Sequence, residues 1–233
     1  MYNVSTYLKY FFDWSEAWAP LIPIFVLLKH RKQPDFMRPV IVYILLAFPI
    51  NLLGDYIGDF KHHLPETYWF QKNVYLYNIH SLVRFVCFAY FFIGLKQPYY
   101  TKLKKVIGFI YLAALFIDLT WYEDFFDKSS IGAHLFTVEA FLLLVYCLLY
   151  YLSKLKNDSD ELMSGADIYV VTGLSIFVVI NFFVFLFYDA ILVEDWEVAD
   201  KMWSVHNIGY IILCLLIAKA FASAKKFNTV ASQ

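Results

Sequence analysis

The chain has 233 residues, of which 61% are hydrophobic and 17% are charged, and its formal net charge is −1. A soluble domain is about half apolar and a quarter charged, so this chain has too few polar residues to cover a water-exposed globule. The balanced charge provides no basic field for nucleic acid, and we expect no nucleic-acid partner. Three cysteines, all within apolar stretches, argue against a disulfide framework.

Seven apolar segments follow one another along the chain, and a helix of about 20 residues is enough to cross a bilayer. They cover residues 14–29, 39–59, 70–95, 105–121, 131–152, 168–188 and 202–221. The first is the shortest and contains Pro20 and Pro23, which membrane helices tolerate when neighbours satisfy the freed backbone groups. With no long linker between them, the segments predict a single all-α transmembrane domain over residues 1–233, a polytopic seven-transmembrane-helix bundle.

Basic residues alternate between the loops, and thirteen of the nineteen Lys and Arg residues lie in one set of loops and in the C-terminal tail. The positive-inside rule places that set in the cytoplasm, with the N-terminus outside and the C-terminus cytoplasmic. The tryptophans gather at the predicted outer ends, where the headgroup region suits their rings: Trp14, Trp18, Trp69, Trp121, Trp196 and Trp203. Two predicted outer loops are acidic: Glu123, Asp124 and Asp127 in one, and Glu194, Asp195, Glu197 and Asp200 in the other. We expect a multi-pass protein of the cell membrane, the bacterial inner membrane.

Polar residues at membrane depth are the best guide to function, because an ionisable group there costs roughly 2.5–3.5 kcal/mol on insertion scales. Asn51 and Asp55 are four residues apart and share one helix face. Most such residues fall in the outer half of their segments, while the inner halves are mostly Leu, Ile, Val and Phe. This pattern predicts an outward-opening polar pocket without a cofactor. Its candidate contacts are Asn51, Asp55, His80, Arg84, Glu139, Asn181, His206 and Asn207.

These residues also have structural interpretations, which stay open. Arg84 and Glu139 lie at similar depth and could form a buried ion pair that fixes helix packing. The asparagines could hydrogen-bond between helices, and each histidine could be a satisfied core residue.

A zinc hydrolase is one alternative, with His80, His134, His206 and Asp55 as metal ligands. Membrane ceramidases and adiponectin-receptor-like proteins have a comparable seven-span layout. Their His-x-x-x-His on the last helix is absent here, because Tyr210 follows His206 at that spacing. A retinal protein is excluded, since it needs a lysine deep in the last helix and Lys219 lies at its end.

The stretch Leu52-Leu53-Gly54-Asp55 resembles the Leu-Gly-Asp signature of the lysoplasmalogenase-like (YhhN) family. His80 falls about where that family has a histidine, and Gly173 through Asn181 resembles its late Gly-x-x-x-Phe segment, with Ile180-Asn181 in place of Ser-Asp. The resemblance implies a vinyl-ether lipid hydrolase in which Asp55 acts in acid–base chemistry, with His80 as the second candidate.

A second resemblance covers most of the helical region. Asn78-Ile79-His80-Ser81, Val138 through Leu142, Asn181-Phe182-Phe183 and Trp203 through Asn207 are similar to recurring segments of short heptahelical membrane proteins common in Bacteroidetes. That family implies the fold and brings no activity.

The leading hypothesis is a sensor-like module that binds a small molecule or a lipid. A membrane lipid hydrolase and a small transporter with an Arg84–Glu139 relay are the alternatives. The expected partners are the bilayer, the ligand, and a membrane protein or second copy that would transmit a signal.

Overall fold

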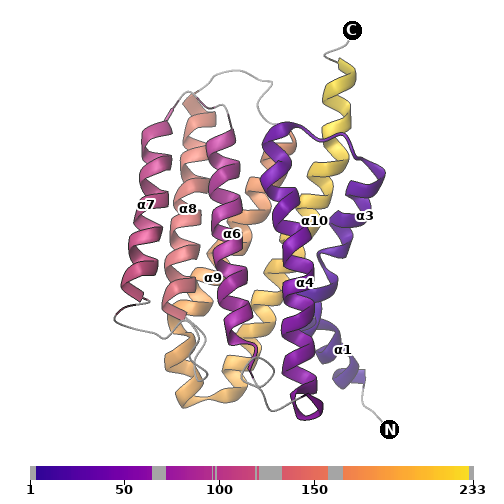
Figure 1. Cartoon of the computed structure of the whole chain (residues 1–233), viewed down its shortest axis with the longest axis vertical. Coiled ribbons are helices and arrows are strands. Elements are labelled where there is room, and N and C mark those ends of the chain that lie inside the picture. Colours follow the sequence, from indigo (N-terminus) through magenta and orange to yellow (C-terminus); the bar gives the residue numbers. More distant parts are fainter. Residues whose placement is uncertain are drawn as a thin grey trace.

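The computed structural model describes residues 4–64, 72–95, 97, 99–118, 120, 133–156 and 165–230, and every regular element within them is helical (Figure 1). Trp69, Trp121 and the predicted acidic loop of Glu123, Asp124 and Asp127 lie outside the described residues. The helices are α1 (Val4–Asp13), α2 (Ser15–Trp18), α3 (Leu21–Lys29), α4 (Arg38–Phe60), α6 (Val74–Gly94), α7 (Thr101–Ile117), α8 (Ala133–Lys156), α9 (Ala166–Glu194) and α10 (Trp196–Val230). Short 3-10 turns, Asp35–Met37 and Lys61–His63, flank α4.

Within the described residues, five stretches are long and apolar enough to cross a membrane. They are Asp35–His63, Val74–Gly94, Ala133–Lys156, Ala166–Tyr188 and Trp196–Ala224. Large apolar side chains on these helices and on α7 point outward, as a lipid environment permits; Phe109, for example, is 71% exposed. The all-helical, multi-pass membrane character predicted from the sequence is therefore confirmed.

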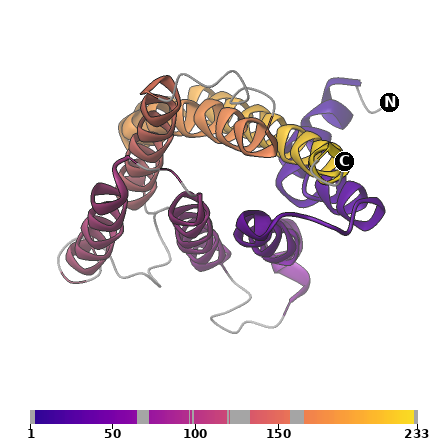
Figure 2. The same cartoon turned by 90° about the horizontal axis from the view of Figure 1, so that it is seen from above.

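The helices form two neighbouring groups. In Figure 2, α8, α9 and α10 make one row, and α4 and α6 lie side by side in front of it. The short helix α3 packs on α10, while α7 packs on α8 and α6. The space between the two groups is filled by side chains, including the aromatic rings of Tyr43, Phe88, Phe177 and Tyr210.

The first apolar segment differs from the single helix expected over residues 14–29. It is split into α2 and α3, and α1 precedes them. The break follows from Pro20, which has no N–H to donate to the carbonyl of Glu16 four residues earlier. The amide of Asn51 on α4 donates to that carbonyl oxygen instead, at 3.0 Å. A neighbouring helix thus satisfies the backbone group that the proline frees, as a buried helix break requires.

The link between α9 and α10 corrects another expectation. Glu194, Glu197 and Asp200 were expected in an acidic loop, but they belong to the ends of two long helices that meet at Asp195. The Asp195 carboxylate accepts hydrogen bonds from the backbone N–H groups of Glu197 and Val198, at 2.9 and 3.2 Å. An aspartate in this position caps a helix start, so α10 begins at once and no long loop forms.

Candidate functional site

The polar residues singled out in the sequence come from five different helices and lie in the interior of the bundle. Seven of them are buried, with at most 5% of the residue surface exposed: Asn51, His80, Arg84, Glu139, Asn181, His206 and Asn207. The eighth, Asp55, is half-buried and lines an open pocket. The seven buried residues lie in the interior next to that pocket, where His206 packs against the pocket residue Trp203, and we call them and their buried polar partners the buried layer.

Arg84 on α6 and Glu139 on α8 form a buried ion pair with two parallel hydrogen bonds. The distances are 2.6 Å from Nε to Oε1 and 2.7 Å from Nη2 to Oε2. Ser81 donates a further hydrogen bond to Oε2, and the guanidinium carbon lies 5.0 Å from the centre of the Phe177 ring. Because the fork of an arginine matches the two oxygens of a carboxylate, this geometry locks α6 against α8.

Glu16 is a member of the buried layer that the sequence analysis missed. It is 3% exposed, and its carboxylate lies 3.0 Å from His206 Nε2. The other nitrogen of that ring, Nδ1, lies 2.7 Å from Asn181 Oδ1. The chain Glu16–His206–Asn181 therefore joins α2, α10 and α9. The sequence did contain a signal: Glu16 is an acidic residue inside an apolar segment, and such residues face the bundle interior.

Asn207 plays the same role as Asn51. Its side-chain amide donates to the backbone carbonyl of Phe12, at 3.0 Å, near the end of α1. Asn51 therefore holds α2, and Asn207 holds α1, each through a backbone carbonyl. Both are hydrogen bonds between helices, an interpretation that the sequence left open.

His80 lies in the centre of the layer between aromatic rings. Its ring is parallel to that of Tyr43, with 5.7 Å between centroids, and perpendicular to that of Tyr210, at 6.1 Å. His80 is 2% exposed, and its Nε2 atom has no hydrogen-bond partner among the described residues. An unsatisfied buried nitrogen costs about 1–3 kcal/mol, so a water molecule or a ligand atom is the expected partner for it.

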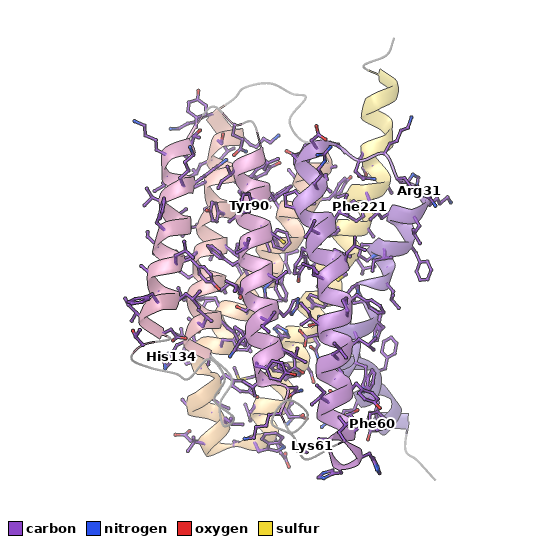
Figure 3. All side chains as sticks on the ribbon, viewed as in Figure 1. Arg31, Phe60, Lys61, Tyr90, His134 and Phe221 are labelled. Atoms are coloured by element: carbon purple, nitrogen blue, oxygen red, sulfur yellow. The ribbon has the colours of Figure 1, made fainter. Side chains whose placement is uncertain are left out.

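An open pocket of about 330 Å³ lies next to this layer, at the lower end of the bundle in Figure 3, where Phe60 and Lys61 are labelled. Its walls carry four aspartates, five aromatic rings and one lysine. The lining residues are Lys9, Asp13, Trp14, Asp55, Gly58, Asp59, Asn73, Tyr77, Tyr188, Trp196, Asp200 and Trp203. Of the eight predicted contacts, Asp55 is the one in this lining.

The pocket carboxylates have few cationic partners. Lys9 binds Asp200 at 2.8 Å, which raises the pKa of the lysine. Asp59 accepts a hydrogen bond from the indole N–H of Trp14 at 2.9 Å. Burial raises the pKa of Asp13, and the nearby charges of Asp200 and Asp59 raise it further, against the opposing effect of Lys9. The pocket therefore has a surplus of negative charge that a cation would relieve.

No protein-family model, curated protein or solved structure matches the chain.

The pocket contacts the buried layer through Trp203. The Trp203 indole stacks on the His206 ring, with 5.2 Å between centroids, and Tyr77 meets it edge-on at 5.8 Å. The Tyr77 hydroxyl also donates a hydrogen bond to Asp55 Oδ1, at 3.4 Å. A molecule bound against Trp203 would thus be separated from the Glu16–His206 contact by one side chain.

The four residues of the zinc alternative do not come together. His134 and Asp118 line a different pocket, of about 360 Å³, between α7 and α8. Across the described residues, no three His, Cys, Asp or Glu side chains are placed so that they could hold a metal ion. The geometry of these residues therefore gives the zinc-dependent alternative no support.

Proposed function

We propose that this protein is a seven-span membrane receptor-like module whose outward pocket binds a small organic cation. The observation that carries the proposal is the composition of the pocket lining, which has four aspartates and five aromatic side chains but one lysine. The volume, about 330 Å³, is at the lower end of the range of small-molecule sites.

Carboxylates and aromatic faces together are the surroundings that favour an ammonium group. Each cation–π contact contributes about 0.5–2 kcal/mol, and the carboxylates add Coulombic attraction. Trp203, Tyr77 and Tyr188 are already grouped, because both tyrosine rings lie about 6 Å from the Trp203 ring. An anionic or purely apolar ligand would leave Asp13, Asp55 and Asp59 without a counter-charge.

The charge distribution supports an outward pocket. The pocket end carries Trp14, Trp196 and Trp203, whereas the opposite end of the bundle carries Lys29, Arg31, Lys154 and other basic residues. In Figure 3, Arg31 lies at the end opposite Lys61. The positive-inside rule then directs the pocket away from the cytoplasm. The broken first segment, α2 and α3, and the 17-residue α7 complete the seven spans of the proposal.

Contacts between the pocket and the buried layer could transmit ligand binding to the first segment of the chain. A ligand that moves Trp203 changes the stacking on His206 and so the contact between His206 and Glu16. Because α2 is joined to α4 and α10 through these polar bonds, the first segment is the element whose position would change. A membrane partner or a second copy would read that change.

The test is ligand titration of the purified protein in lipid nanodiscs, with choline and tetramethylammonium as probes and tryptophan fluorescence as readout. We expect saturable quenching, and affinity about tenfold weaker in Asp55→Asn or Trp203→Leu, a loss of about 1.4 kcal/mol. Asp35→Asn is the matched control, since Asp35 is exposed in the turn before α4, at the helix end opposite the pocket, and pairs with Arg38.

Two results would overturn the proposal. One is an absence of saturable binding by either probe. The other is hydrolysis of a vinyl-ether lysolipid that Asp55→Asn abolishes while the helical content is unchanged, which would make the pocket an active site.

A further inference from the structure

A second hollow, separate from the outward pocket, lies on the outer surface between α6 and α7. Its volume is about 460 Å³. Tyr90, at its rim, lies in the same half of the bundle as Arg31 and Phe221 (Figure 3), away from the aspartate pocket. The lining is apolar except for three tyrosines and Lys105. We call this feature the α6–α7 groove.

The groove exists because small residues occupy its walls and large rings lie flat in its floor. A side chain at Gly108 would meet, within 4 Å, only the hydroxyl of Tyr146, at 3.9 Å. Ala89 faces it from α6. Tyr111 stacks on Phe85 at 3.6 Å between centroids and so lies below the groove instead of filling it. The space between the two helices is therefore left open to the environment of the bundle surface.

The surroundings of the groove are those of a lipid-facing surface. Phe109 and Leu112 on α7 are 71% and 55% exposed, and Tyr90 on α6 is 64% exposed. In a bilayer, hydrocarbon must occupy such a hollow, because an empty space forfeits dispersion contacts and water has too few polar partners there. The occupant is therefore at least partly an acyl chain.

Lys105 provides a positive charge at the end of the groove where the polar headgroup of such an occupant would lie. It is exposed at one end of the groove, and within the described part of the chain no carboxylate pairs with it. Its neighbour Lys104 behaves differently: Lys104 is buried and donates to the carbonyl of Phe92, at 3.2 Å, and to Gln97. Lys104 thus fastens the end of α6, while Lys105 is left to meet an anion.

We propose that the α6–α7 groove binds an anionic glycerophospholipid, with its phosphate at Lys105 and one acyl chain along Gly108 toward Leu112. Leu112 lies seven positions after Lys105, which corresponds to about 10 Å of helix, enough to hold the first half of an acyl chain. Basic residues between membrane helices at the positively charged side are a recurrent site for anionic headgroups. The proposal does not depend on the cation pocket.

The test is native mass spectrometry of the protein released from nanodiscs of equal parts phosphatidylglycerol and phosphatidylethanolamine. We expect preferential retention of phosphatidylglycerol by the natural chain. Lys105→Gln should reduce that preference about fivefold, since a lysine near an anionic lipid surface contributes about 1 kcal/mol. Gly108→Leu should reduce retention of both lipids, because its side chain occupies the groove.

Two control variants separate the groove from general lipid contact. Lys32→Gln removes an exposed charge between α3 and α4, and Ala113→Leu places the same leucine side chain on α7 outside the groove lining. Both should retain lipid like the natural chain. Equal retention of the two lipids by the natural chain, or equal losses in Lys105→Gln and Lys32→Gln, would show nonspecific boundary lipid and overturn the proposal. Because Lys105→Gln leaves the packing of α7 intact, it decides the question even if Gly108→Leu does not fold.

Discussion

Replacing either member of the Arg84–Glu139 pair by an apolar residue leaves the other charge buried without a counter-ion. The two side chains are 6% and 1% exposed, so water cannot take over the lost hydrogen bonds. In Glu139→Leu, the guanidinium loses two hydrogen bonds of 2.6 and 2.7 Å and retains the Phe177 ring. Breaking a buried pair in this way costs about 3–5 kcal/mol, and we expect that loss from Glu139→Leu and from Arg84→Met alike.

The double variant Arg84→Met/Glu139→Leu should behave very differently. It buries two apolar side chains and no charge, and such replacements are often neutral or stabilising. The hydroxyl of Ser81 loses its acceptor, a cost of about 1–3 kcal/mol. The double variant should therefore lie within about 2 kcal/mol of the natural chain, far from the sum of the single changes.

Equilibrium unfolding in mixed micelles, followed by far-ultraviolet circular dichroism, measures these differences. The control is Arg38→Gln, because the Arg38–Asp35 pair has a similar distance, 2.7 Å, but side chains that are 78% and 87% exposed. That change should cost less than about 1 kcal/mol. If Glu139→Leu costs no more than Arg38→Gln, or if the single effects simply add, the pair is not a desolvated ion pair and the reasoning fails.

Three further predictions concern other parts of the molecule. Asn51→Ala should lower the free energy of unfolding by about 1–3 kcal/mol because it leaves the Glu16 carbonyl without a donor. The loss should be smaller in a Pro20→Ala background, where residue 20 regains its N–H. Equal losses in both backgrounds would contradict the role assigned to Asn51. Gly173→Ala should lower the free energy of unfolding by about 1–3 kcal/mol in the same assay, because the new Cβ atom would lie 2.9 Å from the Cβ of Leu216. Gly94→Ala is the control and should have little effect, because a Cβ atom there would meet no atom within 4 Å. Affinity for tetramethylammonium should be highest when Asp13 is ionised and should fall with acidification through a pKa above the ordinary 3.8, because burial raises the pKa of Asp13. Asp13→Asn should remove that part of the pH dependence, and an unchanged pH profile would count against Asp13 as a contact.

The hydrophobic pattern predicted the long helices well. The expected segments 39–59 and 131–152 correspond to α4 and α8, Arg38–Phe60 and Ala133–Lys156. This succeeds because crossing a bilayer requires a continuous apolar stretch, a property that can be read along one segment without knowledge of its neighbours. The same reasoning about depth placed Arg84 and Glu139 at one level, where the structure pairs them.

The sequence did not determine how the first segment folds or what it contacts. The two prolines of this segment, Pro20 and Pro23, are visible in the sequence. The sequence does not show that Asn51 of another helix donates a hydrogen bond to the carbonyl freed by Pro20. Glu16 meets His206 across 190 positions of the chain, and Trp203 lies between that contact and the pocket. The pattern of residues within one segment cannot predict such a contact between two segments, because the contact depends on which helices are neighbours.

What the sequence by itself determined is thus the class of protein, its long helices and the identity of half of the buried polar residues in the described part of the chain. What the tertiary structure decided is which of them pair with one another and which one reaches the open pocket. Asp55 lines that pocket, while His206, with a similar polar character, lies beneath Trp203. The physical reason is that hydropathy fixes the depth of a residue in the bilayer, whereas the rotation and order of the helices, set by side-chain packing, fix its partners.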